Sequence, residues 1–68
     1  MIEYQERVRD EKHLLDEKTE KLSRFQNGTI FKGLPAEEQM LLRFQQRVME
    51  MYSDILLDRI GLFREASE

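Results

Sequence analysis

The sequence predicts an all-α protein, an antiparallel two-helix hairpin that assembles into a homo-oligomeric helical bundle. The hairpin follows from two long segments rich in helix-forming residues. A short stretch between them holds the one Pro and two of the three Gly. The assembly follows from an apolar arc on the second segment that is too wide for a single packing partner.

Length and charge restrict the class of protein. The chain has 68 residues, no Cys and a formal net charge of −3. A domain this small rarely stabilises itself with one core, and without Cys it has no disulfide or thiolate metal site to compensate. DNA and RNA are not expected as partners, because a phosphate-backbone binder carries a basic patch. No apolar run approaches the ~20 residues of a membrane span, and no signal-peptide pattern opens the chain. We therefore expect a cytoplasmic protein with no membrane partner.

The first helix is expected over residues 2–26, which contain no Gly or Pro. Its apolar residues fall within one arc of about 120°, the pattern of a helix with one buried side. These residues are Tyr4, Val8, Leu14, Leu15, Leu22 and Phe25. Asn27 and Gly28 end the helix, because both residue types accept the left-handed conformation common at helix C-termini.

The connection is expected over residues 27–35, and its apolar residues are expected to plug the open end of the core. They are Ile30, Phe31 and Leu34. The second helix is expected over residues 36–64, after Pro35, which suits the first turn of a helix. A tail of residues 65–68 is expected to fray. Residues 1–68 then form one helical-hairpin domain.

The apolar arc of the second helix spans about 200°, against about 100° for a helix with one packing partner. Its members are Met40, Leu41, Phe44, Val48, Met49, Met51, Tyr52, Ile55, Leu56, Ile60, Leu62 and Phe63. One partner helix covers only part of such an arc, and the remainder would be an exposed apolar patch typical of an interface. We therefore expect the chain to bind itself, as a dimer or a higher homo-oligomer.

Charges along the polar edge of the second helix begin with bases and end with acids. In chain order they are Arg43, Arg47, Glu50, Asp54 and Asp58. This order opposes the helix dipole, which favours acids early and bases late. It suits an antiparallel pair of second helices, in which each arginine meets an acid across a two-fold axis near Glu50 and Met51. A chance order of charges on a solvated face explains the pattern equally well.

Two ladders of mainly polar residues, spaced seven apart, each follow one stripe of a helix. They are Tyr4, Glu11 and Lys18, ending on Phe25, and Gln45, Tyr52 and Arg59. A hairpin would bring the ladders together as three polar layers in one seam. The expected pairs are Lys18 with Gln45, Glu11 with Tyr52, and Tyr4 with Arg59.

Two interpretations of the ladders remain open. The layers fix register and oligomer state, as a polar residue at a core coiled-coil position does. Alternatively they line a shared pocket, in which Arg59 and Lys18 donate to an anionic ligand and a tyrosine ring stacks on it. The candidate ligand-binding residues are Tyr4, Arg7, Glu11, Lys18, Gln45, Tyr52 and Arg59. No enzyme activity, metal or cofactor is predicted, because the chain has no Cys, a single His and no nucleophile motif.

A further pattern extends over nearly the whole chain. Its residues are Tyr4-Gln5-Glu6-Arg7-Val8, Glu11-Lys12, Leu15-Asp16, Lys18, Lys21-Leu22, Phe25, Phe31, Leu34, Glu38-Gln39, Met49, Tyr52, Leu56 and Arg59-Ile60. At these positions the chain resembles a family of short phage proteins of unknown function, named after a small open reading frame of a crAss-like phage. The resemblance implies an accessory protein of phage or prophage origin, working in the cytoplasm of the infected bacterial host. It implies no established activity.

Two functions are compatible with these observations. By analogy with small helical phage proteins that sequester signals of host defence, the leading hypothesis is an anti-defence sponge. It would bind a cyclic or ADP-ribose-type nucleotide without turnover. The alternative is a protein-interaction module that inhibits a host protein through an exposed apolar helix face.

Overall fold

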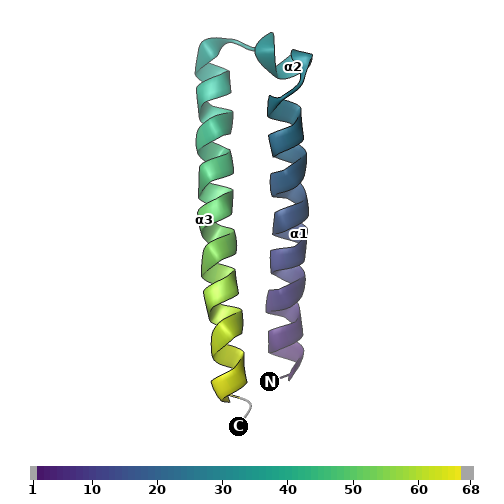
Figure 1. Ribbon diagram of the computed structural model, residues 1–68, viewed down its shortest axis with the longest axis vertical. Coiled ribbons are helices and arrows are strands. Elements are labelled where there is room, and N and C mark those ends of the chain that lie inside the picture. The colour runs from purple at the N-terminus through teal and green to yellow at the C-terminus, as the bar shows by residue number, and fades with distance from the viewer. Residues whose placement is uncertain (1, 67–68) are drawn as a thin grey trace.

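The computed structural model describes residues 2–66, with side chains for residues 3–63. Over this range the chain is all-helical, which confirms the all-α part of the predicted fold class. The helices are α1 (Ile2–Gln26), α2 (Thr29–Lys32) and α3 (Ala36–Ala66). The two long helices lie side by side and run in opposite directions, and the short α2 lies at the end where they are joined (Figure 1). The molecule is a rod of 52 × 14 × 13 Å.

The connection between the long helices differs from the expected one. It contains the additional helix α2, and Gly28 precedes that helix as its N-cap in an extended conformation, with φ −93° and ψ 171°. Gly28 therefore does not use the expected left-handed conformation. α1 is closed instead by turn hydrogen bonds, in which the backbone N–H of Asn27 donates to Arg24 O (3.1 Å) and that of Gly28 donates to Phe25 O (3.0 Å).

The apolar plug consists mainly of one residue of α2. Phe31 is almost completely buried, whereas Ile30 is 70% exposed and Leu34 is half-buried. The Gln39 side chain fastens this turn to α3, because its Nε2 donates to Lys32 O (3.2 Å) and Leu34 O (2.8 Å). At the other end, α3 continues two residues beyond the expected position, to Ala66, and residues 67–68 of the expected tail lie outside the described range.

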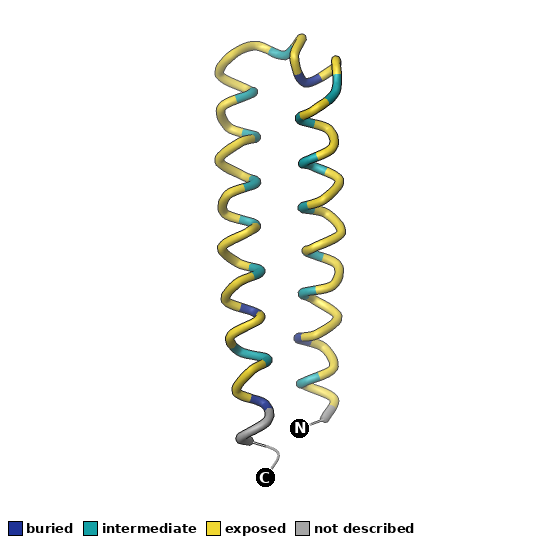
Figure 2. The backbone as a smooth tube through the Cα atoms, in the orientation of Figure 1, coloured by how far each residue is buried: buried dark blue, intermediate teal, exposed yellow. Residues whose placement is uncertain are grey.

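The long helices pack along a seam whose residues are spaced alternately three and four apart, the coiled-coil pattern. In α1 they are Gln5, Val8, Lys12, Leu15, Thr19, Leu22 and Gln26; in α3 they are Gln39, Leu42, Gln46, Met49, Ser53, Leu56, Ile60 and Phe63. All of them are buried or half-buried. In Figure 2, the dark blue and teal positions of the two long helices lie mainly on the sides that face one another. The apolar core of this seam is small. Its buried cluster comprises Val8, Leu56 and Phe63, with Leu15 and Ile60 packed against it.

The molecule exposes more surface than its mass requires. Its accessible surface is 5625 Å², whereas a compact monomer of 8.3 kDa is expected to expose about 4,600 Å². Its radius of gyration is 15.6 Å, compared with about 11 Å for a compact domain of this length. A single protomer is therefore an extended pair of helices with a thin core.

Candidate functional site

The polar ladders do not lie inside the seam, so the prediction of three buried polar layers is wrong. Six of the seven candidate residues are exposed, and the seventh, Arg59, is half-buried. Of the expected pairs, Tyr4 and Arg59 do touch. No hydrogen bond or ion pair joins Lys18 to Gln45, or Glu11 to Tyr52, in the described part of the chain. The physical reason is that the seam follows the stripe beside each ladder, where polar side chains bond to one another across the helices.

An arginine–aromatic cluster lies at the end of the rod that is distant from α2. We call it the Tyr4–Arg59 cluster; its members are Tyr4, Arg9, Arg59 and Phe63. Arg59 Nη2 donates a hydrogen bond to Tyr4 Oη (2.5 Å), and the guanidinium carbon lies 6.0 Å from the centre of the tyrosine ring. Tyr4 and Phe63 meet edge to face, with ring centres 5.9 Å apart. The Arg9 guanidinium carbon lies 5.5 Å from the centre of the Phe63 ring.

The two guanidinium groups of this cluster are held by aromatic rings and a hydroxyl group. Among the residues with described side chains, neither Arg9 nor Arg59 forms an ion pair with a carboxylate. A guanidinium carries five N–H donors in a fixed plane, which matches phosphate and carboxylate groups. Tyr4 is 44% exposed, so an aromatic ring is accessible beside these donors. The cluster therefore has the chemistry to bind an anion that carries a stackable ring.

The remaining candidates surround this cluster or continue its stripes. Arg7 pairs with Glu3 at 3.8 Å, but both side chains are largely exposed, so the pair contributes little stability. Gln45 donates weakly to Met49 Sδ (4.0 Å) within α3. Glu11 and Lys18 follow Tyr4 at the same helical phase, as Gln45 and Tyr52 precede Arg59. Since Tyr4 contacts Arg59, both stripes lie on the same side of the helix pair.

A second arginine–aromatic contact lies near α2, and it differs from the first in burial. The Arg43 guanidinium carbon lies 5.3 Å from the centre of the Phe31 ring. Phe25 meets Phe31 edge to face, with ring centres 6.1 Å apart. Because Phe31 is 2% exposed, its ring cannot stack on a ligand. This contact closes the core at the turn.

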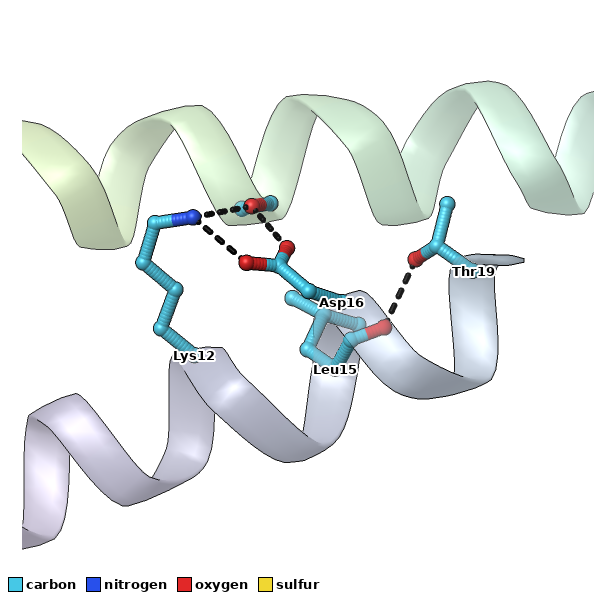
Figure 3. A network of polar contacts seen from close by, with 5 residues as sticks. Lys12, Leu15, Asp16 and Thr19 are labelled. Atoms are coloured by element: carbon cyan, nitrogen blue, oxygen red, sulfur yellow. Dashed lines mark hydrogen bonds and ion pairs between the residues drawn. The ribbon is translucent and has the colours of Figure 1, made fainter. Parts of the chain in front are cut away.

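A polar layer that the sequence analysis missed lies midway along the seam. Lys12 Nζ donates to Asp16 Oδ2 (2.7 Å) and to Ser53 Oγ (3.0 Å), and Ser53 Oγ donates to Asp16 Oδ1 (2.5 Å) (Figure 3). The Lys12 and Ser53 hydrogen bonds hold the pKa of Asp16 below its ordinary value of 3.8. The layer joins α1 to α3 and fixes their register.

A second polar layer lies closer to α2. Gln26 Nε2 donates to Gln46 Oε1 (2.9 Å) and more weakly to Leu42 O (3.4 Å). The signal for both layers was present in the sequence, because Lys12, Gln26, Gln46 and Ser53 occupy positions of the unbroken three–four spacing. Small or hydrogen-bonding residues at such positions pair across the seam when it is formed.

The described residues were also compared with the requirements of a metal site and of a membrane-spanning helix. No group of three or more His, Cys, Asp and Glu residues in the described range is arranged to hold a metal ion. Within the same range, no helix is both long enough and apolar enough to cross a membrane.

Comparison with known proteins assigns the chain to a family. No curated protein and no solved structure matches the chain. Residues 2–62 match the sequence model of the Sequestin family, a range that includes α1, α2 and most of α3. All seven candidate residues lie within the matched range. Because the match covers nearly the whole chain, the protein belongs to the Sequestin family.

Proposed function

We propose that this protein sequesters an anionic nucleotide without turnover, and that the Tyr4–Arg59 cluster binds it. The observation that carries the proposal is the Arg59 guanidinium, which is held against Tyr4 at 2.5 Å and has no carboxylate partner among the described side chains. Its remaining donors are available to a phosphate group, and the adjacent ring offers a stacking surface. The family name, Sequestin, is consistent with a sequestering role.

The ligand class follows from the chemistry of the cluster. The Arg59 guanidinium suits a phosphate group, and the Tyr4 ring suits a base. A cyclic or ADP-ribose-type nucleotide carries both features. The net charge of −3 disfavours long nucleic acids, whose binding depends on many basic contacts. The other candidates, Glu11, Lys18, Gln45 and Tyr52, lie along the same side and are proposed to contact the rest of the ligand.

The biological setting is part of the proposal. The sequence pattern that resembles small phage proteins supports a phage accessory protein that acts in the cytoplasm of the infected host. There, removal of a signalling nucleotide would silence a defence system that depends on it. Binding without turnover requires a stoichiometric amount of protein.

The direct test is calorimetric titration and thermal shift with a panel of nucleotides. The panel contains ADP-ribose, cyclic dinucleotides, inorganic pyrophosphate and uncharged adenosine. We expect at least one pyrophosphate- or phosphodiester-containing nucleotide to bind, and Arg59→Ala to weaken it at least tenfold. The matched control is Arg24→Ala, which removes an arginine from an exposed ion pair with Glu20 on α1 and should leave affinity unchanged. Equal losses in both variants would contradict a site at Arg59.

The same experiment separates sequestration from catalysis. After long incubation, the protein is denatured and the released nucleotide is analysed by mass spectrometry. Recovery of the intact nucleotide at one equivalent per site supports a sponge, whereas recovery of a converted product would identify an enzyme.

A second candidate function follows from the large apolar side chains that α3 exposes. In this alternative, the sequestered species is a host protein bound on that face. It predicts that no nucleotide of the panel binds, and that the apolar face stays accessible in the purified protein.

A further inference from the structure

α3 carries a second apolar stripe on the side that faces away from α1. We call it the outer stripe; its members are Leu41, Phe44, Val48, Met51, Ile55 and Leu62. Each is between 55% and 62% exposed. Their positions are spaced alternately three and four residues apart, as in the seam, and Asp58 occupies the one position of this pattern that is not apolar. At about 100° per residue, the outer stripe lies roughly 150° around the helix from the seam.

We infer that the outer stripe packs against the outer stripe of a second copy, with the two α3 helices antiparallel about a two-fold axis near Met51. The stripe extends a similar distance on either side of this residue, and its positions are apolar on both sides except that Asp58 is the counterpart of Phe44. Val48 then faces the partner subunit's Ile55, and Leu41 faces the partner subunit's Leu62. Met51 lies beside its own copy at the axis. Such an interface uses the same surface on both subunits and closes on itself.

Charge complementarity supports a second copy and sets its direction. Arg47 and Asp54 lie on one flank of the outer stripe, and neither forms an ion pair within the described part of the chain. In the antiparallel arrangement, Arg47 meets the partner subunit's Asp54, and the symmetric pair forms on the other side of the axis. A parallel arrangement could not form this pair, because it would hold Arg47 and the partner subunit's Asp54 about 10 Å apart along the helices at 1.5 Å per residue.

The available area also suits a second copy. At roughly 150 Å² for each large side chain, the half-exposed stripe offers on the order of 500 Å² of apolar surface, and its charged flanks extend this toward the about 800 Å² per partner of a standard interface. Burial of this surface would also remove a large part of the excess of exposed area in the single protomer. A membrane surface is a poorer occupant, because anionic lipids attract basic segments whereas this chain has a net charge of −3.

The arrangement has a consequence for the ligand site, which rests on the proposed function. On the flank opposite Arg47, Arg59 lies level with the partner subunit's Gln45, and Tyr52 lies level with the partner subunit's Tyr52. Residues of both copies would therefore surround each Tyr4–Arg59 cluster. The interface itself is tested without any ligand.

The first experiment is sedimentation velocity on the full chain and on charge-exchanged variants. The wild type is expected at twice 8.3 kDa. Arg47→Glu and Asp54→Arg should each weaken assembly at least tenfold, and the double variant should recover most of it. Arg24→Glu, on an exposed face of α1, is the control and should have no effect. A monomeric wild type, or a double variant no better than either single one, would overturn the inference.

A second experiment reports the direction without depending on affinity. The chain has no Cys, so one introduced Cys gives a single possible disulfide between copies. Met51→Cys should cross-link readily on mild oxidation, whereas Phe44→Cys should not, because antiparallel copies hold that position about 20 Å apart at 1.5 Å per residue. Leu57→Cys, which is exposed on another side of α3, is the control. Efficient cross-linking at Phe44 would indicate a parallel pair and refute the inference.

The two proposals fail separately. A monomer that still binds nucleotide would remove the interface and leave the sponge. A dimer that binds no nucleotide of the panel would remove the sponge and leave the interface.

Discussion

In an ordinary amphipathic helix, the side packed against the rest of the protein is the more apolar one. In α3, the side packed against α1 is less apolar than the side that faces away from it. The side packed against α1 includes the polar residues Gln46 and Ser53, which bond to Gln26 and Lys12 across the seam. The side facing away from α1 carries six large apolar residues that are each more than half exposed. The contacts within one chain therefore specify register, while the largest apolar surface stays exposed on the protomer, where the inferred second copy would cover it. Assembly should supply much of the stability that a single protomer lacks.

The largest effect is expected from a change in the seam. Leu56 is completely buried, so Leu56→Ala should lower the free energy of unfolding by about 2–5 kcal/mol through lost burial and the cavity left behind. The loss should appear at every protein concentration, because the residue packs within the protomer. Denaturant unfolding followed by circular dichroism measures it. A loss below about 1 kcal/mol would show that the seam is not the core of the protomer.

The adjacent residue on the outer stripe gives the matched comparison. Ile55 is 55% exposed in the protomer, so Ile55→Ala should cost little when the protein is dilute. In the assembled protein it should cost about 1 kcal/mol per copy, half the transfer energy of the side chain. Unfolding curves at low and high protein concentration separate the two cases. The same loss at both concentrations would place Ile55 in contact with its own chain.

The smallest effect concerns the polar layer of the seam. Because the folded protein holds the pKa of Asp16 below 3.8, the unfolded chain takes up this proton first as the pH falls. The stabilisation is therefore complete above the ordinary pKa and is lost as the pH falls through the lowered one. Its size should be less than about 1 kcal/mol, since exposed ion pairs are weak and Asp16 is 47% exposed.

Acid unfolding of two variants tests this contribution. Asp16→Asn should be less stable than the wild type at neutral pH and should approach it in acid. Asp10→Asn changes an exposed carboxylate on the same helix and is the control. If both variants gave the same difference from the wild type across the pH range, Asp16 would have no special part in the seam.

The sequence contains clear signals for the long helices. Residues 2–26 lack Gly and Pro, and α1 ends at Gln26, just before Asn27 and Gly28. The four-residue α2 was missed, because a single helical turn has no periodic pattern to detect. The predicted left-handed conformation of Gly28 was also wrong, since the residue precedes a new helix and adopts the extended conformation of an N-cap.

The packing face was harder to predict than the helices. The prediction assumed that α3 packs on α1 through its most apolar arc, and this assumption placed the polar ladders in the seam. In the structure, the less apolar side of α3 packs against α1. Apolar content alone cannot tell which of two stripes meets its own chain, because both follow the three–four spacing. Hydrogen-bonding partners across the seam, such as Lys12 with Ser53, decide between them. The contact of Tyr4 with Arg59 was predicted correctly. The length of the connection between the two long helices sets which of their residues lie at the same level along the rod.

The most direct test of the contrast between the two sides of α3 is the concentration dependence of thermal unfolding in the wild type. If the outer stripe binds a second copy, the melting temperature should rise by several degrees between about 1 μM and about 1 mM protein, because dissociation accompanies unfolding. Val48→Asp, which places a charge in the stripe, should lower the melting temperature and abolish its concentration dependence. A wild-type melting temperature that stays constant over this range would show that the protomer is stable alone and would contradict the account.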